Sequence, residues 1–480
     1  MRSPLLAAAG TLALAALAPP ASAATLQVGP GKPYAKPCAA IAAAAPGDTI
    51  EIDAAGSYDG DVCGWSTDNL TLVGVGGRPS IDAAGAASQG KAIWVIAGDN
   101  TVIDNIELSG ASVPDKNGAG IRQEGKNLTV RRCYFHDNED GILAGDSDGS
   151  EILIEETEFA NNGFGDGLSH NLYINHVARL TFRYNYSHDA IEGHLLKSRA
   201  AENHVLYNRL SQESGTGSYE LDLPNGGLSF VIGNILQQGP SSANSGMLSY
   251  GAEGPHAKNP STDLFVVNNT FVNGKGAGFF ISVGAAMPTP AVVRNNLFTG
   301  GDKLVSQATA LLESNFTDAG GDPLFMDLPS LDVRLKEGSP CQDAGAAPGQ
   351  GQGQSLTPTD HYVHPSQHAP RPQVGPVDIG AYEIGGGQAG SGGTGGGGTG
   401  GTGQAGSGGG GPGGTGGYAP GGEGGYAPGG AGGGGGAGGG GSGSDNGCGC
   451  SVPGRSTDDI GALSALLLGL AVLARRRKSP

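Results

Sequence analysis

The sequence predicts an all-β solenoid, in which one chain winds through successive coils of short parallel strands. A short apolar strand followed by Asn or a small residue recurs at the equivalent positions Cys133, Thr157, Asn185, Asn208, Asn234, Asn269 and Asn296. These positions are 23 to 35 residues apart, which is about the length that three short strands and their turns consume at ~3.3 Å per residue. Leucine-rich repeats would require a tighter and more uniform Leu spacing, which is absent.

Asparagine favours the bends of such a solenoid. It tolerates left-handed backbone, and its side-chain amide can bond the Asn of the next coil. We therefore expect a column of bonded Asn side chains along the coils. Cys133 occupies a repeat position that usually faces inward, which predicts a buried thiol.

The N-terminal 23 residues have the features of a secretory signal. Arg2 supplies the positive start, residues 5–17 form the apolar stretch, and Ala21-Ser22-Ala23 is a small-residue cleavage site. The apolar stretch is too short to span a membrane comfortably. Residues 1–23 are therefore predicted to direct export, and in an exported protein cysteines pair. We expect a Cys38–Cys63 disulfide, because both residues lie in the N-terminal cap region.

The two ends of the repeat region resemble a known family. The Ala-rich residues 38–45 favour a helix, residues 46–48 end it, and residues 49–52 alternate like a strand. This order resembles the N-terminal cap of right-handed parallel β-helix proteins, the pectate-lyase-like group. Residues 378–383, DIGAYE, resemble the closing segment of many bacterial β-helix proteins. The resemblance implies a right-handed parallel β-helix over residues 24–384 with a short capping helix. This scaffold carries lyases, hydrolases, epimerases and adhesins.

Two further segments follow the predicted β-helix domain. Residues 385–447 are Gly-rich with little apolar mass, which predicts a disordered linker. Residues 448–480 contain Cys448 and Cys450, an apolar segment at 460–474 and a basic end. This order resembles the MYXO-CTERM sorting tail of myxobacterial surface proteins, which implies processing near the cysteines by a sorting machinery. A simple tail anchor is the alternative. Both place the β-helix at the outer-membrane cell surface or outside the cell.

The charge balance excludes one class of partner. The formal net charge is -18 and the pI about 4.9, which argues against non-specific nucleic-acid binding. We expect a monomeric exported protein that charge keeps soluble.

The densest polar cluster lies on three successive predicted coils, at residues 170–173, 192–199 and 219–223. Strands on neighbouring coils lie ~4.8 Å apart. The predicted alignment places Leu196, Leu221 and Leu248 inward, and Lys197, Asp222 and Ser249 outward. It also sets Lys197 opposite Ile174 and Glu220 beside Leu195. A slip of one residue would reverse the faces.

This cluster suits β-elimination on a uronic-acid polymer. The reaction removes the proton beside a carboxylate whose charge must be neutralised. Lys197 is the predicted base, with Arg199 or His194 as the charge neutraliser or acid. Tyr173 or His170 could donate to the leaving oxygen. Hard oxygen ligands could hold Ca²⁺, and the candidates are Glu192, Glu220 and Asp222. The candidates for substrate binding are Asn171, Asn225, Tyr250 and Glu253.

Residues 192–198 also resemble the catalytic coil of the β-helix alginate and chondroitin lyases. There, a Glu-containing strand ends in Lys-Ser, and acids on nearby coils bind calcium. The resemblance implies Lys197 as base and Glu192 as metal ligand. The chain departs from the family on the following coil, where Arg-His-Gly is replaced by residues 219–222, YELD. Arg199 would have to substitute for the missing acid.

Three other interpretations remain open. Lys197 with Glu220 or Asp222 could be a solvated ion pair worth about 0 to 1 kcal/mol. The β-helix could bind extracellular acidic polysaccharide, or act as an adhesin, without cutting. A glycoside hydrolase would need a pair of acids ~5–9.5 Å apart, for which Glu220 and Asp222 are the candidates. The concentration of polar residues between His170 and Asp222 favours an enzyme.

Overall fold

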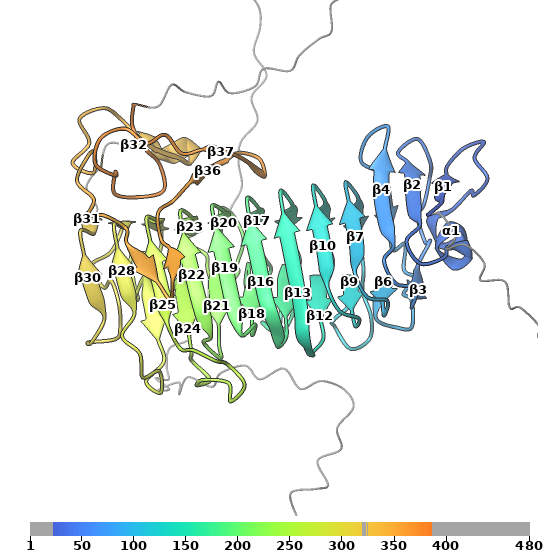
Figure 1. Cartoon of the computed structure of the whole chain (residues 1–480), viewed down its shortest axis with the longest axis horizontal. Coiled ribbons are helices and arrows are strands. Elements are labelled where there is room, and N and C mark those ends of the chain that lie inside the picture. Colours follow the sequence, from blue (N-terminus) through green and yellow to red (C-terminus); the bar gives the residue numbers. More distant parts are fainter. Residues whose placement is uncertain (1–22, 319–322, 324, 386–480) are drawn as a thin grey trace, which may run out of the picture. The chain divides into compact units, whose positions relative to one another are not determined.

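The computed structural model describes residues 23–318, 323 and 325–385, and these residues form a right-handed parallel β-helix. The complete coils each contribute one strand to each of three parallel sheets (Figure 1). Sheet A has 12 strands, namely β1 (Thr25–Val28), β2 (Thr49–Asp53), β4 (Thr71–Val75), β7 (Thr101–Asp104), β10 (Leu128–Arg131), β13 (Ser147–Glu155), β16 (Val177–Arg183), β19 (Glu202–Leu206), β22 (Leu228–Ile232), β25 (Leu264–Val267), β28 (Val292–Arg294) and β30 (Leu311–Glu313).

Sheets B and C complete the coils. Sheet B has 9 strands, namely β3 (Cys63–Trp65), β6 (Ala92–Ile96), β9 (Ala119–Gln123), β12 (Asp140–Ala144), β15 (Leu172–Ile174), β18 (Lys197–Ser198), β21 (Leu221–Leu223), β24 (Leu248–Tyr250) and β27 (Ile281–Val283). Sheet C has 10 strands, namely β5 (Ser80–Asp82), β8 (Glu107–Ser109), β11 (Tyr134–His136), β14 (Glu158–Ala160), β17 (Tyr186–His188), β20 (Arg209–Ser211), β23 (Ile235–Gln238), β26 (Thr270–Asn273), β29 (Leu297–Thr299) and β31 (Phe316–Asp318).

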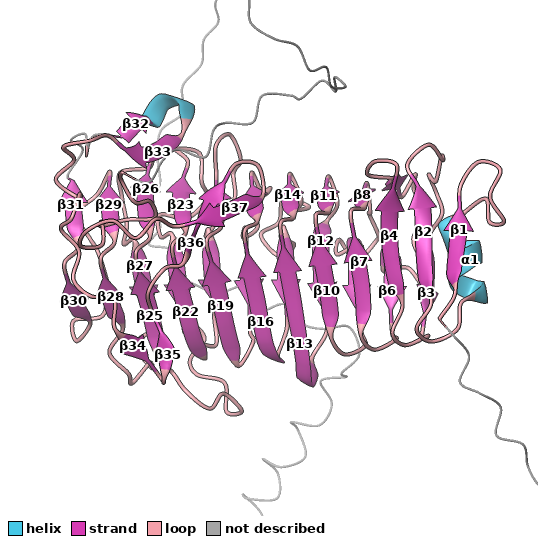
Figure 2. Cartoon of the chain, turned by 45° about the horizontal axis from the view of Figure 1, so that its top comes forward, coloured by secondary structure: helices cyan, strands magenta, loops and turns pink. Residues whose placement is uncertain are grey.

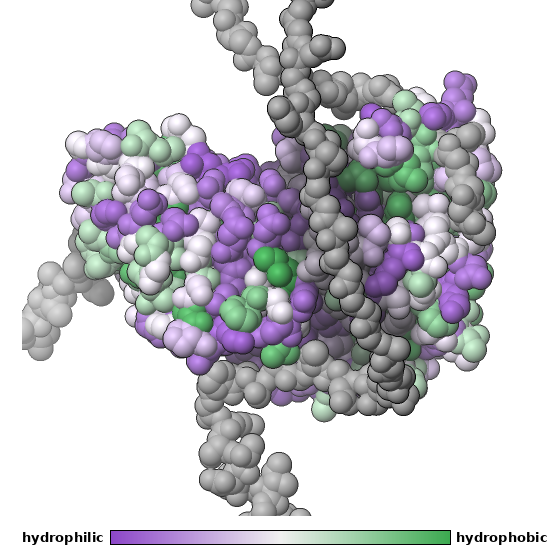
Figure 3. All heavy atoms as spheres, turned by 180° about the vertical axis from the view of Figure 1, so that it is seen from behind, coloured by the Kyte–Doolittle hydropathy of each residue, from purple (hydrophilic) through white to green (hydrophobic). Residues whose placement is uncertain are grey.

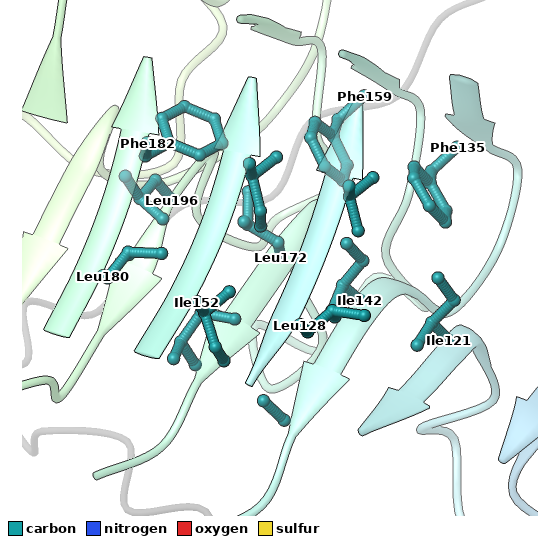
Figure 4. Close-up of a cluster of buried hydrophobic side chains, with 14 of the residues drawn as sticks. Ile121, Leu128, Phe135, Ile142, Ile152, Phe159, Leu172, Leu180, Phe182 and Leu196 are labelled. Atoms are coloured by element: carbon teal, nitrogen blue, oxygen red, sulfur yellow. The ribbon is translucent and has the colours of Figure 1, made fainter. Parts of the chain in front are cut away.

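Stacks of identical or similar apolar side chains fill the interior. Phe135 and Phe159 stack with ring centroids 5.1 Å apart, and Phe182 continues the column (Figure 4). In-register parallel pairing places equivalent residues of successive coils one above the other, so each apolar position becomes a ladder. Seen from behind, hydrophilic residues cover much of the visible surface, with hydrophobic residues scattered among them (Figure 3). The inward apolar side chains form the core, and the outward side chains of the same strands are left to form a surface site.

The predicted asparagine column is confirmed. Asn208 donates its backbone N–H and its side-chain amide to Asn234 Oδ1 at 2.9 Å each, and Asn234 bonds Asn269 in the same way. The column runs through Cys133, Thr157, Asn185, Asn208, Asn234, Asn269, Asn296 and Asn315. Cys133 is buried as expected, and burial raises the pKa of its thiol to about 12.

The N-terminal cap also agrees with the sequence. Helix α1 (Pro37–Ala43) covers the first coil, and β2 follows it. Cys38 and Cys63 form the predicted disulfide, which links α1 to β3. The helix therefore covers the end of the stack, where an open strand edge would invite pairing with another chain.

The segment after the last coil folds into hairpins that the repeat pattern did not predict. Its elements are β32 (Phe325–Asp327), η1 (Leu328–Ser330), β33 (Asp332–Leu335), β34 (Gln350–Gly351), β35 (Gln354–Ser355), β36 (Asp360–Val363) and β37 (Gln367–Pro370). Antiparallel pairs form between β32 and β33, β34 and β35, and β36 and β37 (Figure 2). The DIGAYE residues bond the outside of the coils, because Ala381 donates to Thr270 Oγ1 at 3.0 Å and Gly380 to the Asn295 carbonyl at 2.8 Å.

Several predicted segments lie outside the described residues. These are residues 1–22 of the signal, the Gly-rich linker beyond residue 385, and the tail with Cys448 and Cys450. No helix in the described part of the chain is long and apolar enough to cross a membrane.

Candidate functional site

A column of outward-facing residues on sheet B forms the candidate site. Parallel pairing sets one residue of each strand in line, and the column contains Arg122, Leu143, Tyr173, Lys197, Asp222 and Ser249. The predicted order of Lys197, Asp222 and Ser249 is observed. Successive side chains lie ~4.8 Å apart along the column.

The predicted register was wrong by one residue on the preceding coil. Lys197 pairs with Tyr173, not with Ile174. The side chain of Asn171, just before β15, is buried, accepts from Asn162 and donates to Ser187 Oγ at 3.0 Å. The observed register places Tyr173 outward beside Lys197. Asn171, a predicted substrate contact, lies before the start of β15 and is buried.

Lys197, Asp222 and His194 form the centre of the site. Lys197 Nζ lies 4.0 Å from Asp222 Oδ2 and 5.1 Å from the centroid of the Tyr173 ring. His194 Nε2 lies 3.5 Å from the same Asp222 oxygen. The three residues are 2%, 5% and 8% exposed. Burial raises the pKa of Asp222 to about 6, against the opposing charge of Lys197. The predicted solvated surface pair is therefore excluded, because this pair is buried.

Two stacked imidazoles support this centre. The His194 backbone N–H donates to His170 Nδ1 at 3.0 Å, and the Tyr219 N–H donates to His194 Nδ1 at 3.2 Å. The rings are 4.7 Å apart, and burial lowers the pKa of both well below the ordinary value. Each neutral ring therefore carries its proton on Nε2. His170 has no exposed surface, so its predicted role as proton donor to a substrate is corrected to support of His194.

Arg199 is fully engaged within the protein. Its Nε donates to Tyr173 Oη at 2.7 Å, Nη1 donates to Asn225, and both terminal nitrogens bond Glu253 at 2.6 and 2.9 Å. Burial alone would lower the pKa of Arg199, but the bonds with Glu253 and Tyr173 raise it overall. Burial would likewise raise the pKa of Glu253, and Arg199 reverses this and lowers it. Arg199 thus positions Tyr173, Asn225 and Glu253, and the prediction that it neutralises a substrate charge is corrected.

The three predicted calcium ligands do not converge. Glu192 is exposed on a loop, whereas Asp222 faces outward from sheet B. Glu220 lies between the levels of Leu195 and Met247 in the buried core, with no exposed surface and no hydrogen-bond partner for either carboxylate oxygen among the described residues. Burial raises its pKa well above the ordinary value. These residues do not fit Ca²⁺, and no other cluster of three His, Cys, Asp or Glu in the described chain suits a metal.

Two more predicted contacts are placed differently by the structure. Tyr250 faces inward, packs in the hydrophobic core and donates its hydroxyl to the Gly227 carbonyl at 2.7 Å, so it is not part of the outward column. Asn225 and Glu253 lie at the edge of the site beside Arg199. Sequence reasoning missed Arg122 and Leu143, which extend the column towards the N-terminal coils. The alternation of inward and outward side chains along β9 and β12 could have identified both residues as outward-facing.

Comparison with known proteins agrees on the fold. The family described as the right handed beta helix region matches residues 80–226. No curated protein matches the chain. Among solved structures, the pectate lyase Pel9A is similar with a TM-score of 0.45 and 16% identity, over 72% of this chain and 90% of that protein. The PL6 family alginate lyase AlyGC has a TM-score of 0.30 and 13% identity, over 62% of this chain and 52% of that protein. At such identities the likeness concerns the fold alone.

Proposed function

We propose that the outer face of sheet B binds an acidic polysaccharide and that Lys197 is the base of a β-elimination. The observation that carries this proposal is the position of Lys197 in the outward column, between Tyr173 and Asp222. A polymer lying along the column would meet one side chain every ~4.8 Å. Lys197 is 2% exposed, so the proposal requires the residues around the amine to move when a sugar binds.

The residues of the site can supply the proton acceptor, the proton donor and the charge stabilisation that the elimination needs. The neutral amine of Lys197 takes the proton from C5 of the uronate, the C4–C5 double bond forms, and the C4–O bond breaks. Tyr173 gives a proton to the departing oxygen. His194 offers its Nε2–H to the substrate carboxylate. Asp222, 4.0 Å from Nζ, stabilises the ammonium that forms.

Hydrolysis is the second candidate. The sequence predicted Glu220 and Asp222 as its pair of acids, whereas the structure favours Asp222 and Glu253. Glu220 is excluded by its burial in the core. Asp222 has a raised pKa of about 6, whereas Glu253 has a lowered one. A glycosidase needs one carboxyl group with a raised pKa as the general acid and a second, ionised carboxylate as its partner. Asp222 would be the acid and Glu253 the base or nucleophile.

The nature of the product separates these reactions. The whole protein is incubated with alginate, pectate and glycosaminoglycans, in calcium and then in chelator. A lyase produces ultraviolet absorbance from the unsaturated uronate together with new reducing ends. A hydrolase produces reducing ends alone, and Glu253→Gln abolishes them. Absence of both products on every polymer contradicts catalysis and leaves a binding or adhesive β-helix.

We further propose that the protein is exported. The Cys38–Cys63 disulfide supports an oxidising compartment. Display at the cell surface and processing near Cys448 and Cys450 belong to the same proposal, which rests on the sequence of the tail.

A further inference from the structure

A cavity of about 430 Å³ lies away from sheet B, between the turns that follow sheet A and the tip of the β36–β37 hairpin. Segments far apart in the sequence form it, since the hairpin packs beside the middle coils (Figure 2). Its volume is in the range of small-molecule sites. The lining residues are Arg78, Asn105, Arg132, Glu156, Glu158, Pro365, Ser366, Gln367 and His368.

Arg78 brings an available positive charge to this cavity. Its side chain is exposed, and no ion pair to it forms among the described residues. The loop that bears it is fixed, because Asn105 Nδ2 donates to the carbonyls of Gly74 at 3.0 Å and Gly77 at 2.6 Å. The second arginine, Arg132, is instead paired with Asp104. An unpaired guanidinium on a fixed loop is suited to a carboxylate or sulfate.

Ser366 is an independent sign of a ligand. It is 9% exposed, it lines the cavity, and its Oγ has no hydrogen-bond partner among the described residues. Buried hydroxyl groups are normally bonded. A ligand that carries hydroxyl groups would satisfy this one.

Contacts with neighbouring residues fix several side chains of the cavity lining. The His368 ring stacks on Tyr184 with centroids 3.8 Å apart, and its Nδ1 lies 3.2 Å from Glu156 Oε1. On the opposite wall, Glu158 Oε1 lies 3.3 Å from His188 Nε2. The two carboxylates are fixed acceptors that line the same cavity as Arg78, and such a mixed set matches a sugar acid.

We propose that this cavity binds one uronate unit of an acidic oligosaccharide. Arg78 pairs with the carboxylate, Ser366 Oγ bonds one sugar hydroxyl, and Glu156 and Glu158 accept from others. The choice of a uronate rests on the proposed function, whereas the anion-binding cavity does not. A polymer held here and on sheet B at once would dissociate more slowly than from either alone.

The test is calorimetric titration of the whole protein with trimers of galacturonate, mannuronate or guluronate. All titrations use a Lys197→Ala background, in which cleavage does not consume the ligand. We expect a trimer to bind in the cavity, in addition to any binding on sheet B. Arg78→Gln should weaken the cavity binding at least tenfold and Ser366→Ala several-fold, with any binding on sheet B unchanged. Arg179→Gln, which changes an exposed arginine of sheet A, should leave binding unchanged. Maltotriose, which has no carboxylate, should not bind.

Two results would overturn the inference. One is binding in Arg78→Gln equal to that of its parent, which would move the ligand to another place. The other is no binding of any of the three trimers at millimolar concentration. If Arg78-dependent binding is found in a protein that forms no unsaturated product, the cavity stands and the lyase proposal fails. Loss of product without loss of this binding in Lys197→Ala would support both.

Discussion

Lys197 is a charged side chain that keeps almost no contact with solvent, and its neighbours define its role. Asp222 Oδ2 at 4.0 Å provides the counter-charge, and His194 Nε2 lies 3.5 Å from the same oxygen. When Lys197 takes a proton, the ammonium that forms already faces the fixed carboxylate of Asp222, so the surrounding groups need little rearrangement. The protonation state of Asp222 should therefore control the activity.

The first prediction concerns pH. Because burial raises the pKa of Asp222 to about 6, activity should rise as pH increases through that value and the carboxylate ionises. Asp222→Asn should lose about 100-fold in kcat and should lack this acidic limb. Initial rates between pH 4.5 and 8 measure it. An unchanged limb in Asp222→Asn would assign the titration to another group.

The second prediction concerns Glu220, whose pKa burial raises well above the ordinary value. The unfolded chain loses this proton near pH ~4.3, whereas the folded protein keeps it. Stability should therefore fall as pH rises from that value to the raised pKa. Glu220→Gln should flatten this part of the curve of melting temperature against pH. The exposed Glu151→Gln serves as control, and equal slopes in both variants would show that Glu220 does not titrate in this window.

Sequence alone predicted the place of Lys197 and Asp222 and failed for Glu220. The reason is local. Lys197 and Asp222 lie within strands, where alternation fixes the direction of a side chain. Glu220 precedes β21, in the turn, where alternation no longer holds. Arg199 was misassigned because Glu253, its partner, lies 54 residues further along the chain.

At the scale of elements, the asparagine column joins neighbouring coils inside the solenoid. Asn234 accepts from the N–H and the amide of Asn208 and donates to the Val205 carbonyl at 2.7 Å. These groups are buried. Their bonds satisfy backbone groups at a bend that has no strand partner of its own.

The third prediction is that Asn234→Ala destabilises the protein by about 2 to 5 kcal/mol, since it leaves several buried polar groups unsatisfied. Asn100→Gly is the matched control, because Asn100 belongs to an exposed row with Asn69 and Asn127 and has a φ of 58° that Gly accepts. Chemical denaturation compares the two. A loss of stability no larger in Asn234→Ala than in the control would contradict the structural role of the column.

The repeat pattern predicted these coils and their Asn positions, since every coil needs an inward apolar strand followed by a residue that fits the bend and bonds the next coil. It did not predict the register between β15 and β18, in which Lys197 pairs with Tyr173. Nor did it predict the hairpins β32–β37, because their residues have no period and are held by contacts with distant coils.

At the scale of the whole molecule, the solenoid presents chemically different faces. Sheet B carries the Lys197 column, and the turns after sheet A form a cavity with the β36–β37 hairpin. One rigid stack thus positions two polar sites. The second was invisible in the sequence, because Arg78 and Ser366 are brought together by folding.

The central claim is that Lys197 is the base of a β-elimination on an acidic polysaccharide. The most direct measurement is the ultraviolet absorbance of the unsaturated product from the whole protein, Lys197→Ala and Lys126→Ala. Lys126 is an exposed lysine outside the column. We expect the wild type and Lys126→Ala to form product at equal rates, and Lys197→Ala to be slower by about 10²–10⁴-fold. Product formation by Lys197→Ala at the wild-type rate would contradict the assignment.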